Sequence, residues 1–344
     1  MKISISMGAF TRTRPEELIQ YAQFADRIGV DCMWSAEAWG NDAIAPLAFI
    51  AGHTERMKLG TGIMQISARA PSMVAMTALT LAALTKNRFI LGLGVSGPQV
   101  VEGLHGVPYR APLSRLKETV EIVRSAFRGE KLSIDGKFHT LPLPGGEGKA
   151  IRLDHPPNPD IPIFLATLAP RSLEYTGAAA NGWLGTSFSP DHPNAHLEHL
   201  RRGAESAGRS LGELELQAAC TVSIGEDVEA LIEARRPAVA FQMGAMGSAN
   251  TNFYNEAFQR AGFADDALAI QALWIEGKRE EAAARVPDAM VTEFGAIGTP
   301  DMVLERFRRY KAAGITSLGI RIDGDLAARS ATLEQVMDLV NAAG

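Results

Sequence analysis

Residues 58–94 read KLGTGIMQISARAPSMVAMTALTLAALTKNRFILGLG, and this stretch contains one complete strand–helix–strand unit. Residues 58–64 and 88–94 are short apolar runs between turn residues, which is typical of buried strands. Residues 71–84 form a longer apolar segment that begins with proline, a favoured first residue of a helix. A strand, a helix and a second strand in this order predict that the two strands pair in parallel.

The same unit recurs along the whole chain of 344 residues. Strands followed by helical patterns imply a parallel sheet, and eight units fit a closed barrel better than an open sheet. The sequence therefore predicts the α/β class, a (β/α)8 TIM barrel, as a single domain over 1–344. The predicted strands are 3–8, 31–37, 58–64, 88–94, 161–167, 182–186, 214–224 and 317–322. The main predicted helices are 14–28, 43–53, 71–84, 115–127, 170–180, 196–207, 300–313 and 333–343.

Two insertions, at about 129–160 and 227–290, interrupt this rhythm. The first contains an alternating run around Asp135-Gly136, which predicts a small hairpin. The second is helical throughout and rich in aromatic residues. Because insertions on the loops of a barrel build its binding pocket, we interpret both as lid or wall elements. For the second insertion, extra packing or a dimer surface is the alternative.

Composition limits the partners and the location that we expect. A formal net charge of −5 gives no basic footprint for nucleic acid, so any anion site must be local. No apolar run is long enough to span a bilayer, and the N-terminus lacks the pattern of a secretory signal. Cys32 and Cys220 each lie in an apolar segment, which favours buried free thiols in the cytoplasm. We thus expect a small-molecule substrate, with no nucleic acid and no membrane as partners.

Residues 92–97 match the phosphate-binding pattern G-x-G-x-x-G. A dinucleotide fold requires that pattern in the first strand–helix unit, whereas here it follows the fourth strand and precedes Pro98. We therefore favour another interpretation. Small residues at the end of a strand let backbone N–H groups approach a flat ligand.

His192, His196 and His199 are spaced so that one helical face could present all three. Such a face can bind zinc. The pattern lacks H-E-x-x-H, however, and its neighbours are surface-like residues, so we predict a solvated helix face and no metal site. Nucleophile motifs typical of hydrolases are also missing from the sequence.

The turn at residues 168–172 is a candidate anion site. It follows a predicted strand, and Pro170 suits the first turn of a helix. The exposed N–H groups of such a turn attract phosphate, and Arg171 adds positive charge. An ordinary strand–helix turn is the alternative.

Residues 59–71, 87–106 and 297–306 together resemble the luciferase-like monooxygenase superfamily, most closely its coenzyme F420-dependent oxidoreductase branch. The resemblance implies a homodimer that transfers a hydride between F420 and an organic substrate. An FMN-dependent monooxygenase is the alternative with a different cofactor. A non-catalytic flavin-binding relative is the third possibility.

The resemblance also implies the site residues. Members hold the cofactor ring at the C-terminal mouth of the barrel, against a non-prolyl cis peptide that maps to Gly62-Ile63. The residues implied behind the ring are Gly62, Ile63 and Met64; those in the turn after the fourth strand are Val95, Ser96, Gly97 and Gln99; those around the cofactor phosphate are Thr167, Leu168, Ala169, Arg171 and Ser172.

The sequence departs from the sugar-phosphate dehydrogenases of this superfamily. Where those enzymes carry a histidine and a glutamate, this chain has Ala38 and Gly97, so sugar-phosphate oxidation is not expected. Glu37 remains as the best catalytic candidate near the ring. Weaker candidates are Trp39, Glu102 and His105.

Overall fold

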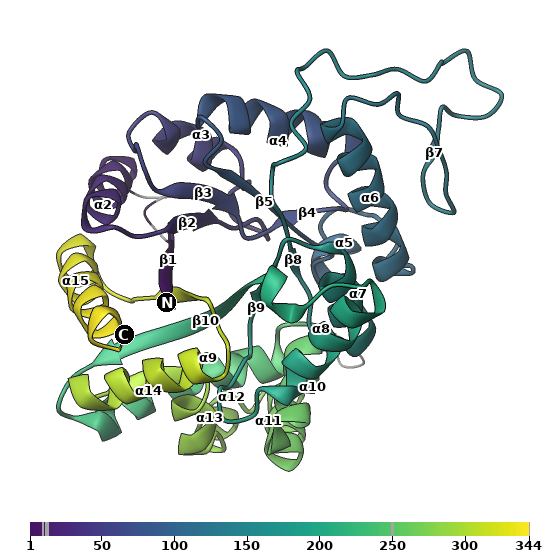
Figure 1. The fold of residues 1–344 in the computed structure, drawn as a ribbon. Coiled ribbons are helices and arrows are strands. Elements are labelled where there is room, and N and C mark those ends of the chain that lie inside the picture. Colours follow the sequence, from purple (N-terminus) through teal and green to yellow (C-terminus); the bar gives the residue numbers. More distant parts are fainter. Residues whose placement is uncertain (9, 11–13, 249–250, 344) are drawn as a thin grey trace.

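The computed structural model describes residues 1–8, 10, 14–248 and 251–343, and this part of the chain forms a closed parallel barrel (Figure 1). Neighbouring barrel strands pair in parallel, and β12 returns to β1 to close the ring. The predicted fold is confirmed. The barrel strands are β1 (Lys2–Ser6), β2 (Cys32–Ser35), β3 (Lys58–Thr61), β5 (Phe89–Gly94), β8 (Ile163–Ala166), β9 (Gly182–Gly185), β10 (Glu215–Ile224) and β12 (Ser317–Arg321).

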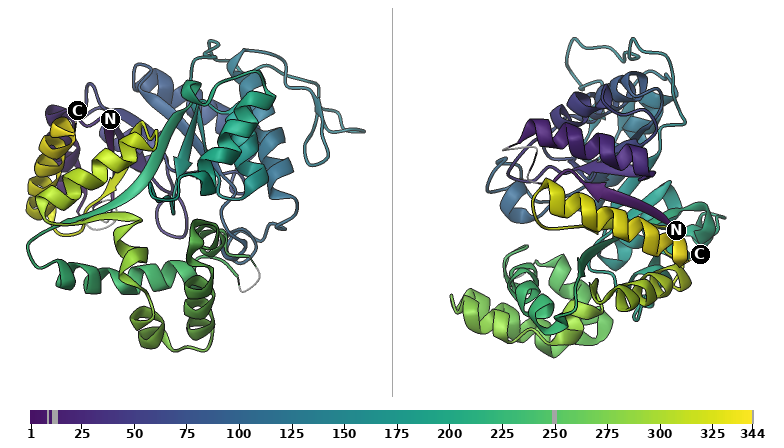
Figure 2. Two further views of the ribbon diagram at one scale, coloured as in Figure 1. Left: turned by 60° about the horizontal axis from the view of Figure 1, so that its bottom comes forward. Right: turned by 90° about the vertical axis from the view of Figure 1, so that its left-hand side faces the viewer.

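Helices surround the barrel (Figures 1 and 2). They are α2 (Pro15–Ile28), α3 (Ala45–Ala51), α4 (Pro71–Leu84), α6 (Pro112–Phe127), α7 (Pro170–Ala179), α8 (Asn194–Ser206), α14 (Pro300–Ala312) and α15 (Leu326–Ala342). The predicted helices are confirmed, but α15 begins seven residues before the expected start at 333. The carboxylate of Asp325 accepts a hydrogen bond from the N–H of Ala328 at 3.0 Å and caps this earlier start.

Large side chains fill the barrel interior. Trp34, Phe164 and Leu184 form a buried cluster inside it. Gly60 makes room for the Trp34 ring, since a Cβ at residue 60 would lie only 2.2 Å from Trp34 Cζ3. A ligand at the mouth must therefore lie above Trp34 rather than enter the barrel.

Two short strands extend the barrel sheet. β4 (Met64–Gln65) continues beyond β3 and pairs with β5. β11 (Gly295–Gly298) pairs with β10 and was not predicted, because Gly-Ala-Ile-Gly is too short to show a period.

The first insertion contains the expected hairpin, made of β6 (Ile134–Asp135) and β7 (Thr140–Leu141). The turn lies at residues 136–139, slightly later than predicted, because Glu118 of α6 accepts hydrogen bonds from the N–H groups of Lys137, Phe138 and His139. The insertion leaves the barrel between α6 and β8, at the end opposite the mouth. The hairpin then folds back along α6, and the segment after it projects from the molecule (Figure 1).

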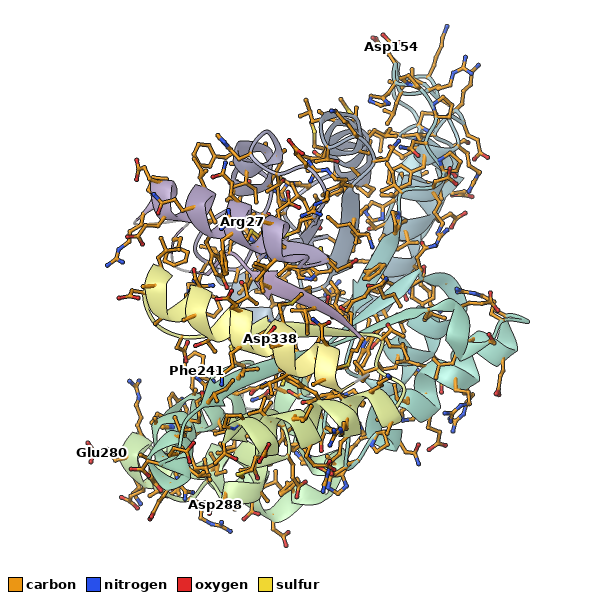
Figure 3. The ribbon with its side chains drawn as sticks, turned by 60° about the vertical axis from the view of Figure 1, so that its left-hand side comes forward. Arg27, Asp154, Phe241, Glu280, Asp288 and Asp338 are labelled. Carbon is orange, nitrogen blue, oxygen red and sulfur yellow. The ribbon has the colours of Figure 1, made fainter. Side chains whose placement is uncertain are left out.

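The second insertion follows the C-terminal end of β10, and it is helical as predicted. Figure 3 shows Asp288 of this insertion and Asp154 of the first at opposite ends of the molecule. Met243, Phe258 and Ile270 belong to a separate small core within it. Its helices are α9 (Val228–Gly244), α10 (Phe253–Phe258), the π-helix η2 (Gln259–Phe263), α11 (Ala264–Ile275), α12 (Arg279–Ala284) and α13 (Asp288–Thr292).

Cys32 and Cys220 are buried free thiols, as predicted. Within the described ranges, no helix combines the length and the apolar character needed to cross a membrane.

Candidate functional site

The parallel barrel brings the predicted site residues to one end. Glu37 follows β2, Gly62 and Ile63 follow β3, and residues 95–97 and 167–172 follow β5 and β8. In a barrel of this type the C-terminal strand ends carry the binding site. The peptide bond between Gly62 and Ile63 is cis, as predicted.

The segment after β3 presents a small apolar surface at the mouth. Gly62 and Ile63 are half-buried, and Ile63 packs against the cluster around Trp34. Gly94 allows this packing, because a Cβ there would lie 2.4 Å from Ile63 Cδ1. The Met64 side chain is fully buried in the main core, so of these three residues Gly62 and Ile63 are the ones that keep surface at the mouth.

The carboxylate of Glu37 is buried and already bonded. Its Oε1 accepts hydrogen bonds from Arg69 Nη1 at 2.6 Å and from the N–H of Gln65 at 2.9 Å. Its Oε2 accepts from the N–H of Ala43 at 3.1 Å. The Gln65 amide donates in return to the backbone oxygen of Glu37. Glu37 thus fastens the end of β2 to the segment that follows the cis peptide.

Two hydrogen bonds fix the turn after β5, one with Tyr109 and one with the second insertion. Ser96 has a positive φ of 60°, and Gly97 precedes α5 (Pro98–Val101). The hydroxyl of Tyr109 donates to the Ser96 oxygen at 3.3 Å. The exposed Gln99 amide donates to the oxygen of Gly247 in the second insertion.

The turn after β8 is the N-terminus of α7, as the sequence suggested. Thr167 is bonded to Thr176 through their hydroxyls at 2.7 Å, and the Ser172 hydroxyl donates to the Ala169 oxygen at 2.8 Å. Arg171 is exposed and forms no ion pair with a described residue. Its guanidinium is therefore free to meet an anion, whereas the N–H groups of Ser172 and Leu173 in the first turn of α7 already donate to the Ala169 oxygen.

Sequence reasoning missed three residues of the site, namely Arg69, Tyr109 and Arg260. Arg260 of η2 donates to the Leu168 oxygen at 2.7 Å, and burial lowers the pKa of its guanidinium. Two further contacts join the second insertion to the barrel: Gln99 donates to Gly247, and Gln242 donates to Ser187 at 2.8 Å. The three contacts place the second insertion along the rim, beside the segments that follow β5, β8 and β9. No local sequence pattern could identify these pairs, since their partners are distant along the chain.

The three weaker catalytic candidates have different surroundings in the structure. Trp39 is 64% exposed beside the mouth. Glu102 is bonded to the N–H of Tyr109 at 2.9 Å. His105 is exposed, so its place gives no support for a role in the site.

The predicted solvated histidine face is wrong for His196, which is fully buried. Its ring packs against Trp183 and Phe188, with centroids 5.4 and 5.9 Å away, and neither ring nitrogen has a described partner. Burial, with smaller contributions from Arg260 and His199, lowers the pKa of His196 to about 3. The helix itself was predicted correctly. The prediction failed because Trp183 and Phe188, which cover this face, lie outside the helix.

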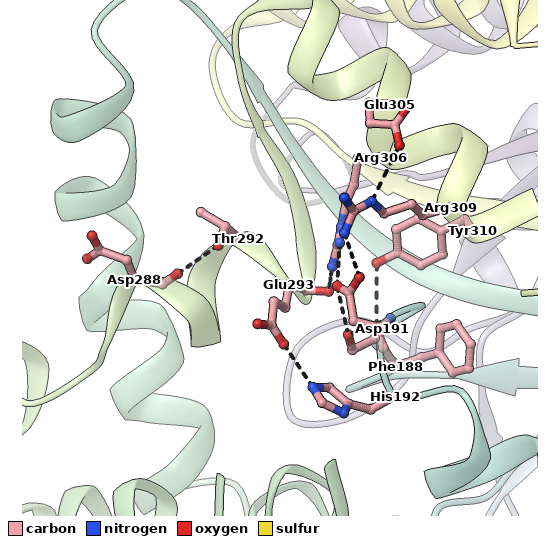
Figure 4. Close-up of polar contacts among 11 residues, drawn as sticks. Phe188, Asp191, His192, Asp288, Thr292, Glu293, Glu305, Arg306, Arg309 and Tyr310 are labelled. Atoms are coloured by element: carbon pink, nitrogen blue, oxygen red, sulfur yellow. Dashed lines mark hydrogen bonds and ion pairs between the residues drawn. The ribbon is translucent and has the colours of Figure 1, made fainter. Parts of the chain in front are cut away.

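His192 takes part in a polar network between the barrel and the second insertion (Figure 4). Its Nε2 lies 3.1 Å from Glu293 Oε2, while Asp191 accepts from Arg306 at 2.5 Å and Arg309 at 2.8 Å. Burial acts to raise the pKa of Asp191, but the two arginines outweigh it and the pKa is lowered. In the part of the chain that the structure describes, no cluster of three or more His, Cys, Asp or Glu side chains could hold a metal ion.

Comparison with known proteins identifies the family of the chain. The model of the family described as luciferase-like monooxygenase matches residues 3–317. A Mycobacterium tuberculosis protein, provisionally named a coenzyme F420-dependent oxidoreductase, is 35% identical over 98% of both chains. The 5,10-methylenetetrahydromethanopterin reductase of Archaeoglobus fulgidus is 27% identical over 88% of both chains.

Solved structures share the fold. The coenzyme F420-dependent tetrahydromethanopterin reductase from Methanopyrus kandleri superposes with a TM-score of 0.80 at 23% identity, over 99% of this chain and 98% of that one. The oxygenating constituent of 3,6-diketocamphane monooxygenase from Pseudomonas putida, in complex with FMN, has a TM-score of 0.71 at 16% identity, over 100% and 98%.

Proposed function

The chain belongs to the luciferase-like monooxygenase family, and from that premise we propose that it is an F420-dependent oxidoreductase acting on a small organic substrate. The observation that carries the proposal is the mouth itself. Gly62, Ile63 and the turn at residues 95–97 offer half-buried apolar and backbone surface above the Trp34 floor. Similarity to relatives named for F420 supports the choice of cofactor.

The residues at the mouth fit a flat ring. Side chains are missing at Gly62 and Gly97, and nothing except the Gln99 amide lies within 4 Å of a Cβ built at residue 97. A planar ligand can therefore approach the backbone there. In this proposal Gly62 and Ile63 lie behind the ring, with the Met64 backbone beyond them, and Val95, Ser96, Gly97 and Gln99 border its edge.

When bound, the deazaflavin ring supplies the carbon that accepts or donates the hydride. The chain orients the ring, excludes water and holds the anionic end of the cofactor. We assign that last role to the guanidinium and the N–H of Arg171 at the start of α7, within the turn formed by Thr167, Leu168, Ala169 and Ser172.

Glu37 is better suited to positioning than to proton transfer. Its two oxygens already accept three hydrogen bonds, one of them from a cation. We propose that Glu37 acts on the reaction through the segment from Gly62 to Gln65, whose place it fixes.

Titration with the two cofactors tests the proposal. We expect F420 to bind at least about tenfold more tightly than FMN and to be turned over with an organic substrate. Tight binding of FMN alone would favour the monooxygenase alternative, which the likeness to an FMN-bound fold keeps open. Binding of either cofactor without turnover would favour the non-catalytic relative.

We also propose a cytoplasmic homodimer. The buried free thiols suit a reducing compartment. The outer face of helix α4 is largely apolar although it lies on the surface, which is typical of a helix that is covered in an assembly. Met73, Met76 and Leu84 of α4 and Phe49 of the adjacent α3 expose between 46% and 62% of their surface. A second copy is the occupant that we propose for this face.

A further inference from the structure

We propose that the recess between the barrel rim and α6 binds an oxyanion, either carboxylate or phosphate, carried by the ligand that occupies the mouth. This inference rests on the proposed function for the identity of that ligand. It concerns a second anion site, separate from the turn at α7. The recess is lined by Ile66, Ser67, Val95, Val101, Val107, Pro108, Tyr109, Arg110, Pro112, Arg115, Thr119 and His139.

Two residues that line the recess carry polar atoms without a hydrogen-bond partner in the part of the chain that the structure describes. The Nε of Arg115 and the hydroxyl of Ser67 are both buried, and neither has a hydrogen-bond partner among the described residues. A buried donor without a partner costs free energy, so such groups are normally satisfied. An oxyanion in the recess would accept from both.

The charge of the recess favours an anion. Arg115 lies over the Phe138 ring, with its guanidinium carbon 5.0 Å from the centroid, and forms no ion pair with a described residue. Exposed Arg110 stands at the rim and is likewise without an ion pair in the described ranges. Arg115 also lies in the first turn of α6, a 16-residue helix whose N-terminal end carries partial positive charge.

Two acids lie close to the recess, and the carboxylates of both are already bonded. Glu102 accepts a hydrogen bond from the N–H of Tyr109 at 2.9 Å. Glu118 accepts hydrogen bonds from three backbone N–H groups of the hairpin and lies 3.2 Å from His139 Nδ1. Burial acts to raise the pKa of Glu118, but these hydrogen bonds outweigh it and the pKa is lowered. The Glu118 carboxylate is thus already bonded to the hairpin, and the hairpin places His139 and Phe138 beside the recess.

The recess adjoins the proposed ring site. Val95 lines it, and Tyr109 donates from its wall to the oxygen of Ser96 in the turn after β5. Burial raises the pKa of Tyr109 to about 12, so its hydroxyl stays a neutral donor near pH 7. A ligand with a ring at Ser96 and a flexible acidic chain can therefore reach both places.

The variant Arg115→Gln tests the assignment, with Lys117→Gln as its matched control. Both changes remove one positive charge from α6. Lys117, however, faces α7, where its ammonium lies 5.1 Å from the centroid of the Tyr175 ring. We expect Arg115→Gln to weaken F420 binding about tenfold, the size of a charge-assisted hydrogen bond. Lys117→Gln should change it less than about twofold, and Arg115→Lys should keep most of the affinity.

A second arm uses inorganic phosphate and glutarate at matched ionic strength and needs no cofactor. Each should raise the melting temperature of the wild type and of Lys117→Gln more than that of Arg115→Gln. A difference with these probes but none with F420 supports the site and assigns the anion to the substrate. If the wild type binds no F420, the proposed function is contradicted. The experiment with phosphate and glutarate then still tests whether the recess binds an anion. Equal responses of both variants to the probes, with equal affinity for F420 where it binds, overturn the inference.

Discussion

Arg69 Nη1 lies 2.6 Å from Glu37 Oε1, and this ion pair joins the end of β2 to the chain just beyond Gly62-Ile63. Only 7% of the Glu37 side chain and 19% of the Arg69 side chain are exposed. Removal of one partner of such a buried pair is costly in stability, because it leaves the other partner as an unpaired buried charge.

Arg69→Met should therefore destabilise the protein by about 3 kcal/mol, measured by urea unfolding at neutral pH. The variant should also bind cofactor more weakly, since the segment that backs the ring is released. A loss below about 0.5 kcal/mol would show that water already screens the pair.

Glu37→Gln separates positioning from catalysis. If Glu37 only fixes the segment after β3, affinity and kcat should fall together by modest factors, and the pH profile of kcat should keep its shape. A general acid or base would instead lose about 10²–10⁴-fold in kcat with unchanged affinity. Loss of one limb of the pH profile would then reinstate Glu37 as the catalytic residue.

The phosphate turn gives the next prediction. Arg171→Ala should weaken F420 binding about tenfold to a hundredfold, because a charge-assisted hydrogen bond contributes roughly 1.5–3 kcal/mol. If only the helix N–H groups hold the phosphate, the loss should be smaller, at about 0.3–1 kcal/mol. Ala169→Asp is the control, since it places negative charge against the anion in either case. Unchanged affinity in both folded variants would place the phosphate elsewhere.

The sequence predicted the barrel because each strand–helix unit carries its own signal. Residues 71–84 show this most clearly, since the predicted helix has the observed bounds. The candidate site was predictable only where its residues are adjacent in sequence, as at the cis peptide Gly62-Ile63 or the turn from Leu168 to Ser172. Arg69, Tyr109 and Arg260 act through partners 13 to 92 residues away, so no local pattern marks them. His196 shows the same limit, because burial of a helix face depends on which element packs against it.

The proposed dimer depends on the apolar surface of α4. Met76→Glu places a charge in the middle of that surface and should convert the dimer to monomer in analytical ultracentrifugation. Leu143→Glu is the control, because Leu143 is 72% exposed on the projecting segment of the first insertion. A wild type that sediments as a monomer, or a Met76→Glu variant that stays dimeric, would contradict this interface.

His196 should make the protein sensitive to acid. Its pKa is about 3 in the folded protein, against about 6.5 in the unfolded chain, so the unfolded chain binds the proton more tightly between those values. The contribution of neutral His196 to stability is therefore complete above pH 6.5 and is lost progressively as the pH falls toward 3. At pH 4.5 the loss should be about 2–3 kcal/mol, at 1.36 kcal/mol for each pH unit below 6.5.

His196→Phe should remove this pH-dependent loss of stability, because a phenyl ring fits between Trp183 and Phe188 and binds no proton. The measurement is the free energy of unfolding in urea at pH 7 and pH 4.5. Wild type should lose about 2–3 kcal/mol more than His196→Phe between the two pH values. His105→Gln, which removes an exposed histidine, should lose as much as wild type. Equal acid losses in wild type and His196→Phe would mean that the buried imidazole gains its proton without opening the aromatic cluster, and that the acid sensitivity of the fold arises elsewhere.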